Sequence, residues 1–266
     1  MTRADPIPPV PTVLVTGGGV RLGAELCRAF ARAGWRVLCQ YRRSADAARA
    51  LCQQLRDQGH DAIAIEGDLA SETGRRALMA QAAAVAGPVT CLINNASAFE
   101  PDTGAGFDAE LARMQLEVNL IAPLSLAREL AASLPAGAEL DASVIHILDQ
   151  KVFNLNPDYF SYTVSKLALE RAVALQAQAL APRVRVCGVA PGLMYPSGPQ
   201  TQDNFDRASR VNLLRRATDP ADVARTCLFL ARTQSITGST LCVDSGQHLV
   251  PLARDVMFAV EDNPQP

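Results

Sequence analysis

The chain has 266 residues, of which 48% are hydrophobic and 20% are charged, and its formal net charge is −2. This composition predicts a globular protein with a sizeable core, and the charge gives no electrostatic reason to expect nucleic acid or an anionic membrane as a partner. No apolar run approaches the roughly 18 residues that indicate a membrane span, so we expect no membrane association.

The chain ends and the cysteines indicate a compartment. Residues 1–11 contain several prolines but no apolar stretch of a secretory signal, and we interpret them as a flexible leader. The seven cysteines are odd in number and scattered, and none forms a C-x-x-C pair. Free thiols in a reducing compartment explain this pattern better than disulfides, so we expect a cytoplasmic protein. The three histidines have no ligand spacing, and we expect no metal site.

Short apolar runs alternate with amphipathic segments along most of the chain. The runs are continuously apolar, as strands of a parallel sheet are when both faces are covered. We predict strands over 12–16, 36–40, 62–66, 89–94, 143–148, 185–189 and 240–243, and helices near 21–34, 44–58, 72–86, 107–134, 159–181 and 219–233. This alternation predicts a single doubly wound α/β domain of the Rossmann type over 12–248, with a seven-stranded parallel sheet flanked by helices.

Two segments do not follow the alternation. Residues 192–215 are rich in Pro, Gly, Ser, Gln and Asn near their start and show no clear period. Because this segment follows a strand end, where open sheets bind ligands, we interpret it as a substrate lid. Residues 249–266 form a C-terminal tail for which the sequence suggests no role.

The first strand runs directly into a glycine-rich turn, Thr16-Gly17-Gly18-Gly19-Val20-Arg21-Leu22-Gly23, and then into a helix. Glycines let the backbone turn sharply beside a pyrophosphate, and the helix N-terminus offers free N–H groups. Such loops also occur as plain turns, but the position between the first strand and the first helix favours a dinucleotide site.

The end of the second strand favours one of the two nicotinamide dinucleotides. NAD requires an acidic residue there to accept from the ribose hydroxyls. This chain has Tyr41-Arg42-Arg43-Ser44 instead, with no carboxylate before Asp46. Two guanidiniums and a hydroxyl suit a 2′-phosphate, which predicts NADPH. The alternative is that these basic residues are only exposed to solvent at the edge of the sheet.

Tyr162 and Lys166 lie four residues apart in the predicted helix 159–181. This spacing places the phenol and the ammonium on one helical face. A nearby positive charge favours phenolate, so we expect Lys166 to lower the pKa of Tyr162 and to make it a usable proton donor. The pair alone is common by chance.

Together these motifs resemble the short-chain dehydrogenase/reductase family. The turn matches the family pattern T-G-x-x-x-G-x-G at Thr16, Gly17 and Gly23, with Arg21 in place of the middle glycine. Asn94-Asn95-Ala96-Ser97 resembles the family's N-N-A-G, and Tyr162 with Lys166 matches Y-x-x-x-K. Pro191-Gly192 matches the step beside the nicotinamide, so the resemblance spans roughly residues 12–248.

The resemblance implies roles for individual residues. Tyr162 would donate the proton, Lys166 would also hold the nicotinamide ribose, and Asn119 would orient the lysine through water. The implied NADPH-binding residues are Gly17, Arg21, Leu22, Tyr41, Arg42, Arg43, Ser44, Asp68, Leu69, Asn95, Ala96, Ser97, Tyr162, Lys166, Pro191 and Gly192. Family members are commonly tetramers built through the helices near 107–134 and 159–181, which implies a homo-oligomer here.

Asp149 lies thirteen residues before Tyr162, where typical family members carry a serine. A carboxylate would repel a developing alkoxide, but it suits a substrate that gains a proton on nitrogen. Arg21, Asp149 and Phe99, the last in an N-N-A-S-x-F stretch, together resemble the pteridine reductase and dihydromonapterin reductase branch. That resemblance implies a substrate site of Arg21, Ser97, Phe99, Asp149, Tyr162 and Leu193, and a catalytic set of Asp149, Tyr162, Lys166 and Asn119.

The predicted function is therefore NADPH-dependent reduction of a small-molecule pteridine to its tetrahydro form. Candidate substrates are dihydropterins such as dihydromonapterin or dihydrobiopterin, and dihydrofolate. Two alternatives stay open, a carbonyl or 3-oxoacyl reductase of the same family and a non-catalytic NADPH-binding regulator. Asp149 argues against the first, and the presence of both Tyr162 and Lys166 argues against the second.

Overall fold

The computed structural model describes residues 10–134, 142–198 and 200–262, so most of the predicted leader lies outside the described residues. The predicted seven-stranded sheet is confirmed: all strand pairs are parallel, in the order β3-β2-β1-β4-β5-β6-β7. The strands are β1 (Thr12–Val15), β2 (Arg36–Tyr41), β3 (Ala62–Glu66), β4 (Cys91–Asn94), β5 (Ala142–Ile147), β6 (Val184–Pro191) and β7 (Thr240–Val243). They match the predicted ranges to within a few residues.

The strand order reverses direction between β1 and β4. The chain winds outward from β1 through β2 to β3, and then crosses back to β4 on the other side of β1. The connections that leave β1 and β4 therefore diverge, and this leaves a crevice at the carboxyl ends of the strands. Both the glycine-rich turn and the Asn95-Ala96-Ser97 loop begin at this crevice.

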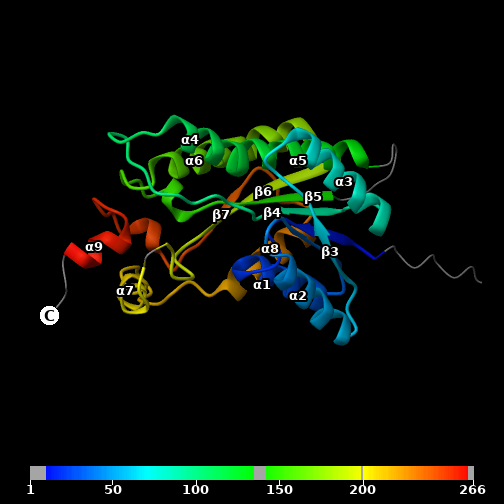
Figure 1. The fold of residues 1–266 in the computed structure, drawn as a ribbon, viewed down its shortest axis with the longest axis horizontal. Helices are drawn as coiled ribbons and strands as arrows, with labels where there is room; N and C mark the ends of the chain where they lie inside the picture. Colours follow the sequence, from blue (N-terminus) through cyan, green and yellow to red (C-terminus); the bar gives the residue numbers. More distant parts are fainter. Residues whose placement is uncertain (1–9, 135–141, 199, 263–266) are drawn as a thin grey trace, which may run out of the picture.

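Helices cover both faces of the sheet (Figure 1), as the buried apolar strands require. In this view α1, α2 and α8 lie below the sheet, whereas α3, α4, α5 and α6 lie above it. Each layer encloses its own buried apolar cluster. The helices are α1 (Arg21–Arg32), α2 (Ala45–Asp57), α3 (Glu72–Ala86), α4 (Ala109–Leu116), α5 (Ala122–Ser133), α6 (Phe160–Leu180) and α8 (Pro220–Arg232).

The predicted helix over 107–134 contains a widened turn. A π-helical segment, η1 (Glu117–Ile121), separates α4 from α5. Pro123 follows that segment, and it has no N–H to donate to the carbonyl of Asn119 four residues earlier. A helix that lacks this bond is free to widen there, and such turns are frequent at functional sites. The turn carries Asn119, whose side chain is fully buried.

The expected lid and tail segments contain regular structure. The lid range 192–215 includes α7 (Gln202–Ala208), which Thr201 caps through a bond from the Asn204 amide. Beyond residue 248, the tail forms the end of η3 (Gln247–Leu249) and then α9 (Val256–Asp262). α7 and α9 lie side by side at one end of the sheet, where Asn204 Nδ2 donates to the carbonyl of Met257 at 3.0 Å (Figure 1). Within the described ranges, none of the helices has the length and hydropathy needed to cross a membrane.

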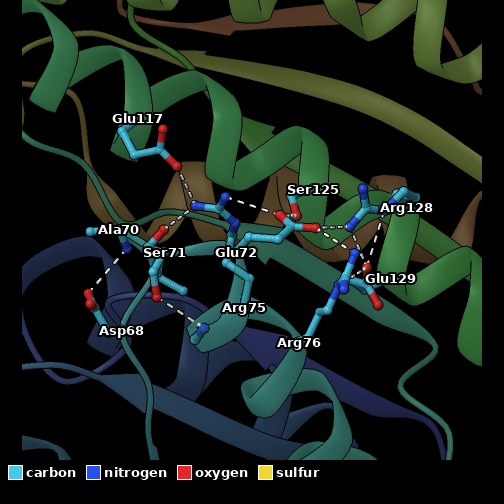
Figure 2. Close-up of polar contacts among 12 residues, drawn as sticks. Asp68, Ala70, Ser71, Glu72, Arg75, Arg76, Glu117, Ser125, Arg128 and Glu129 are labelled. Carbon is cyan, nitrogen blue, oxygen red and sulfur yellow. Dashed lines mark hydrogen bonds and ion pairs between the residues drawn. The ribbon is translucent and has the colours of Figure 1, made fainter.

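An ion network joins α3 to α5 (Figure 2). The carboxylate of Glu72, in the first turn of α3, accepts from Ser125 and Arg128 on α5, and also pairs with Arg75. These partners, Arg128 first, lower the pKa of Glu72 to about 2. The network therefore holds two helices of the upper layer together at the surface.

Arg75 extends this network toward the crevice. Its guanidinium is buried, and it donates to the carbonyl of Leu69 at 2.7 Å and to Glu117 Oε1 at 2.6 Å (Figure 2). Leu69 belongs to the loop after β3, and Glu117 begins the π-helical turn. One side chain thus fixes the loop that carries Asp68 and Leu69, two of the implied NADPH-binding residues, relative to the segment that carries Asn119.

We predict that Glu72→Gln lowers the melting temperature at pH 7 by a few degrees at most, because the network is exposed to solvent. The pKa of Glu72 is lowered in the folded state, so its contribution is present above about pH 4.5 and disappears as the pH falls toward 2. Melting curves at pH 7, 4.5 and 3 should therefore show a gap between the variant and the parent that closes with acidification. Glu110→Gln, in an exposed pair with Arg113, is the control and should change little.

Candidate active site

A cavity of about 470 Å³ lies at the carboxyl ends of the central strands. It brings together residues from the turn after β1, the loop after β4, the end of β5, the start of α6 and the segment after β6. Most of the predicted site residues line it: Gly17, Arg21, Leu22, Asn95, Ala96, Ser97, Phe99, Asp149, Tyr162, Lys166, Pro191, Gly192 and Leu193. The fold therefore places these predicted residues around a single cavity.

The glycine-rich turn forms a cradle with space only for backbone. Gly17 has a φ of +61°, in the left-handed region that favours glycine. A Cβ on Gly23 would collide with the carbonyl of Gly17 and would lie 2.9 Å from Asn95 Nδ2. No side chain caps the N-terminus of α1 that follows, so its first N–H groups are available. This arrangement fits a pyrophosphate.

Arg21 also has a left-handed backbone, with a φ of +49°. It occupies the position where the family pattern has a glycine, and this conformation costs a non-glycine residue about 1–2 kcal/mol. Its guanidinium lies 5.0 Å from the centre of the Tyr195 ring and donates to the carbonyl of Pro196 at 3.0 Å. The side chain therefore links the glycine-rich turn to the expected lid.

The basic residues predicted for the cofactor's 2′-phosphate lie at the end of β2, outside the cavity lining. Arg42 and Arg43 are exposed, and Arg42 pairs with Asp68 at 3.7 Å. Tyr41 is buried instead, and its hydroxyl accepts from Arg49. Ser44 and Leu69 likewise lie beside this edge rather than in the cavity lining.

Gln40 is a structural residue of this edge that the sequence analysis missed. Its buried side chain accepts from the Gly17 amide at 2.8 Å and donates to the carbonyl of Gly67 at 2.7 Å. The side chain therefore holds the turn after β1 against the loop after β3. The sequence carried only one sign of this role. Gln40 is a polar residue within an apolar strand, where helices cover both faces of the sheet.

Asn119 organises the loop after β4. Its Oδ1 accepts from the Ala98 amide at 2.8 Å, and its Nδ2 donates to the carbonyl of Ala98 at 2.9 Å and to Ser165 Oγ at 3.0 Å. Ser97 Oγ also donates to Asn119 Oδ1. These direct bonds position Ser97 and Phe99 at the cavity, and the water-mediated role implied for Asn119 stays a prediction.

Asp149, Tyr162 and Lys166 meet at the centre of the cavity. The hydroxyl of Tyr162 donates to Asp149 Oδ2 at 2.9 Å. Lys166 Nζ donates to the carbonyl of Ile147 at 2.8 Å and lies 5.8 Å from the centre of the Tyr162 ring. The carboxylate thus faces the phenol inside the pocket rather than the solvent.

The expected direction of the Tyr162 pKa was wrong. Burial, followed by the charge of Asp149, raises the pKa of Tyr162 well above its ordinary value. Burial lowers the pKa of Lys166 to about 8, and Asp149 opposes this effect. Burial also raises the pKa of Asp149. The spacing of Tyr162 and Lys166 revealed their proximity, but not that desolvation and a carboxylate outweigh the ammonium.

Phe99 belongs to a group of aromatic rings beside the phenol. It stacks on Tyr159 with ring centres 4.2 Å apart and meets Tyr162 edge to face at 4.7 Å. Phe99 is only partly buried and lines the cavity. Phe99, which was predicted to be part of the substrate site, therefore lies in the cavity beside the Tyr162 phenol.

The sequence analysis missed a second group of residues that line the same cavity. Those not named beforehand include Gln150, Lys151, Met194, Tyr195, Gln247, Asp255 and Val256. Gln150 and Lys151 follow Asp149 directly in η2 (Gln150–Val152), so proximity in sequence was an available signal. Asp255 and Val256 come from the tail, where no motif pointed to them. Among the described residues, no group of three or more His, Cys, Asp or Glu side chains could hold a metal ion.

Comparison with known proteins shows the family of the chain. A family model described as enoyl-(acyl carrier protein) reductase matches residues 19–248. The chain belongs to the short-chain dehydrogenase/reductase family. It is therefore an oxidoreductase, and the resemblance drawn from its motifs is confirmed.

Several relatives are similar over nearly their full length. Pteridine reductase 1 of Leishmania tarentolae is 30% identical, covering 91% of this chain and 98% of that protein. Dihydromonapterin reductase of Citrobacter koseri is 24% identical, covering 94% and 100%. A protein of Streptomyces violaceoruber named for ketoacyl reduction in granaticin polyketide synthesis is 28% identical, covering 93% and 100%.

One solved structure is similar in both fold and sequence. FolM alternative dihydrofolate reductase 1 from Brucella canis, complexed with NADP, superimposes with a TM-score of 0.86 and is 38% identical. The match covers 90% of this chain and 94% of that one.

We predict that Asn119→Ala lowers the free energy of unfolding by about 2–4 kcal/mol, because it leaves the partly buried N–H and C=O of Ala98 without their side-chain partner. Urea unfolding at neutral pH measures this loss. Gln53→Ala removes an exposed helical side chain and should stay within about 0.5 kcal/mol of the parent. Equal stability of the two variants would contradict the assigned role of Asn119.

Proposed function

We propose that this protein is an NADPH-dependent reductase that converts a dihydropteridine to its tetrahydro form. The observation that carries the proposal is the 2.9 Å hydrogen bond from Tyr162 to Asp149 inside the cavity. Asp149 occupies the position at which typical family members place a serine. The similarity to the pteridine, dihydromonapterin and alternative dihydrofolate reductases supports the same substrate class.

The residues present fit NADPH. The cradle of Gly17 and Gly23 and the uncapped N-terminus of α1 suit the pyrophosphate. Arg42 and Arg43 are exposed at the end of β2, where a 2′-phosphate would lie. Lys166 would hold the nicotinamide ribose. When bound, the cofactor supplies the hydride.

Asp149 and Tyr162 supply the proton. Burial favours the neutral form of both groups, so the phenol retains its proton at physiological pH and the carboxyl resists ionisation. A proton held between them can pass to a nitrogen of the substrate ring. Lys166, which is largely protonated at pH 7, keeps the site from accumulating negative charge.

The chemistry of Asp149 favours a nitrogen heterocycle over a ketone. Reduction of a carbonyl develops negative charge on oxygen, and Asp149 beside it would raise the barrier whenever it is ionised. Reduction of a ring imine instead requires a proton on nitrogen, which a carboxyl group can provide or stabilise. Phe99 lines the cavity beside Tyr162, so a flat ring bound there would contact an aromatic side chain. The carbonyl or 3-oxoacyl reductase is the alternative, and a non-catalytic regulator would not need the paired Tyr162 and Asp149.

We also propose a homo-oligomer, a tetramer by family resemblance, in a cytoplasmic setting. The helices expected to build it expose large apolar side chains, which include Met114, Ile121, Val164 and Leu175. Six of the seven cysteines are buried, which suits thiols in a reducing compartment. Size-exclusion chromatography with light scattering tests the assembly.

We predict that Tyr162→Phe reduces turnover of dihydropterins at least about 100-fold, because the proton donor is lost. The affinity for NADPH, measured by fluorescence titration, should remain within a few-fold of the parent, since the cradle is untouched. Unchanged turnover would remove the proton-donor role. Loss of NADPH binding would instead show that the phenol supports the cofactor site.

We predict that Asp149→Ser weakens dihydropterin reduction by at least about tenfold in kcat/KM while ketone reduction stays equal or rises. The assay follows NADPH oxidation against a panel of dihydropterins, dihydrofolate and simple ketones, for the parent and the variant. The parent should turn over the heterocycles. A parent that reduces only ketones, or a variant with improved dihydropterin turnover, would contradict the proposed substrate class.

A further inference from the structure

Four charged side chains lie along one wall of the cavity. Two of them, Asp149 and Lys166, come from the predicted catalytic set. The other two are Lys151 from η2 and Asp255 from the tail, more than 100 residues apart in sequence. The wall therefore contains two ammonium groups and two carboxylates, and one of the carboxylates comes from a segment that the proposed chemistry does not use.

Lys151 is close to Asp149 but pairs with another residue. Its backbone amide donates to Asp149 Oδ1 at 2.8 Å, which places the two side chains on the same turn. Its Nζ lies 2.8 Å from Asp255 Oδ2 and 5.2 Å from the centre of the Tyr159 ring, and only 3% of its side chain is exposed. The ammonium is thus desolvated, and Asp255 is the carboxylate that compensates for it.

The tail is docked firmly enough to present Asp255. The backbone amide of Asp255 donates to Asp158 Oδ2 at 2.7 Å, and Arg254 pairs with the same carboxylate at 2.8 Å. Phe258, on α9, lies nearly parallel to the Tyr159 ring at 6.3 Å. The tail therefore contacts the loop immediately before α6, the helix that carries Tyr162.

We infer that Asp255 is a positioning residue of the active site: it holds the Lys151 ammonium away from Asp149 and thereby keeps the Asp149 carboxyl from being locked in its ionised form beside Tyr162. A buried ammonium that loses its carboxylate is strongly destabilised unless it finds another. The Lys151 charge also acts on Asp149 and Asp158, and Asp158 is already paired with Arg254, which leaves Asp149 as the alternative. Without Asp255, Asp149 would face two lysines and would be kept ionised.

The electrostatic environment agrees with this geometry. The charge of Lys151 opposes the burial that raises the pKa of Asp149, and the charge of Asp255 adds to the rise in the pKa of Tyr162. The charged and titratable groups around this wall are Asp149, Lys151, Asp158, Tyr159, Tyr162, Lys166, Arg254 and Asp255. Because the ion pair is neutral as a whole, its effect on Asp149 depends on both members being present.

Three variants test the inference by the sign of their effects. In Asp255→Asn, Lys151 is unpaired and stabilises the Asp149 carboxylate, so the midpoint for Asp149 should move about 1 pH unit lower. In Lys151→Met, the unpaired Asp255 carboxylate should move the midpoint higher. The double variant removes both charges and should return the midpoint close to that of the parent. A purely structural role predicts no such pattern of opposite shifts and rescue.

The inference rests on the proposed function only for the catalytic roles of Asp149 and Tyr162. The main measurement therefore needs no substrate. Carboxyl ¹³C NMR of aspartate-labelled protein follows the titration of Asp149, whose signal is identified by its absence in Asp149→Asn. The same midpoints should appear in the pH profile of kcat/KM for dihydropterins. If the protein proves inactive on dihydropterins, the proposed function fails while the NMR result still decides the inference.

The control is Glu261→Gln, which removes one negative charge from α9, the helix that follows Asp255, at a residue that contacts Asn204 instead of the cavity. It should leave the Asp149 midpoint unchanged. Should Asp255→Asn fail to fold, the upward shift in Lys151→Met remains the test. Identical midpoints in the parent and Lys151→Met, or shifts of equal sign in both single variants, would overturn the inference.

Discussion

Keeping a carboxyl group beside a phenol in a desolvated pocket is the constraint around which this site is built. Asp149 follows a strand whose residues are all buried, and its Oδ2 accepts from Tyr162. Burying such a group is costly unless hydrogen bonds and opposite charges compensate it. The compensation comes from α6, which provides the charge of Lys166, and from η2, which provides the Lys151 backbone amide.

The parts of this arrangement that are local in sequence could be predicted from it. Continuous apolar runs indicated the strands, because a strand covered on both faces has mostly apolar side chains. The spacing of Tyr162 and Lys166 placed both on one helical face, and the glycine-rich turn indicated where the backbone comes close to a ligand. In each case the physical signal lies within about ten residues, and the fold needs only to bring the ends of neighbouring strands together.

The parts that depend on distant partners could not be predicted. Lys151 and Asp255 are each unremarkable in sequence, and only the docking of the tail on Asp158 makes them a buried pair. The direction of the Tyr162 pKa failed for a related reason, because it is set by how much water the folded cavity excludes. The widened turn at Asn119 was also missed, although Pro123 four residues later removes the bond that a regular helix needs there.

Arg21 shows how a departure from a motif can indicate function. Its φ of +49° retains the left-handed turn that a glycine would adopt without strain, so the backbone path is unchanged and only the side chain is new. That side chain contacts Tyr195 and Pro196 at the start of the expected lid, and both Arg21 and Tyr195 line the cavity. A conformational cost of this kind persists only where something compensates it. Here the compensation is a connection between the glycine-rich turn and the expected lid.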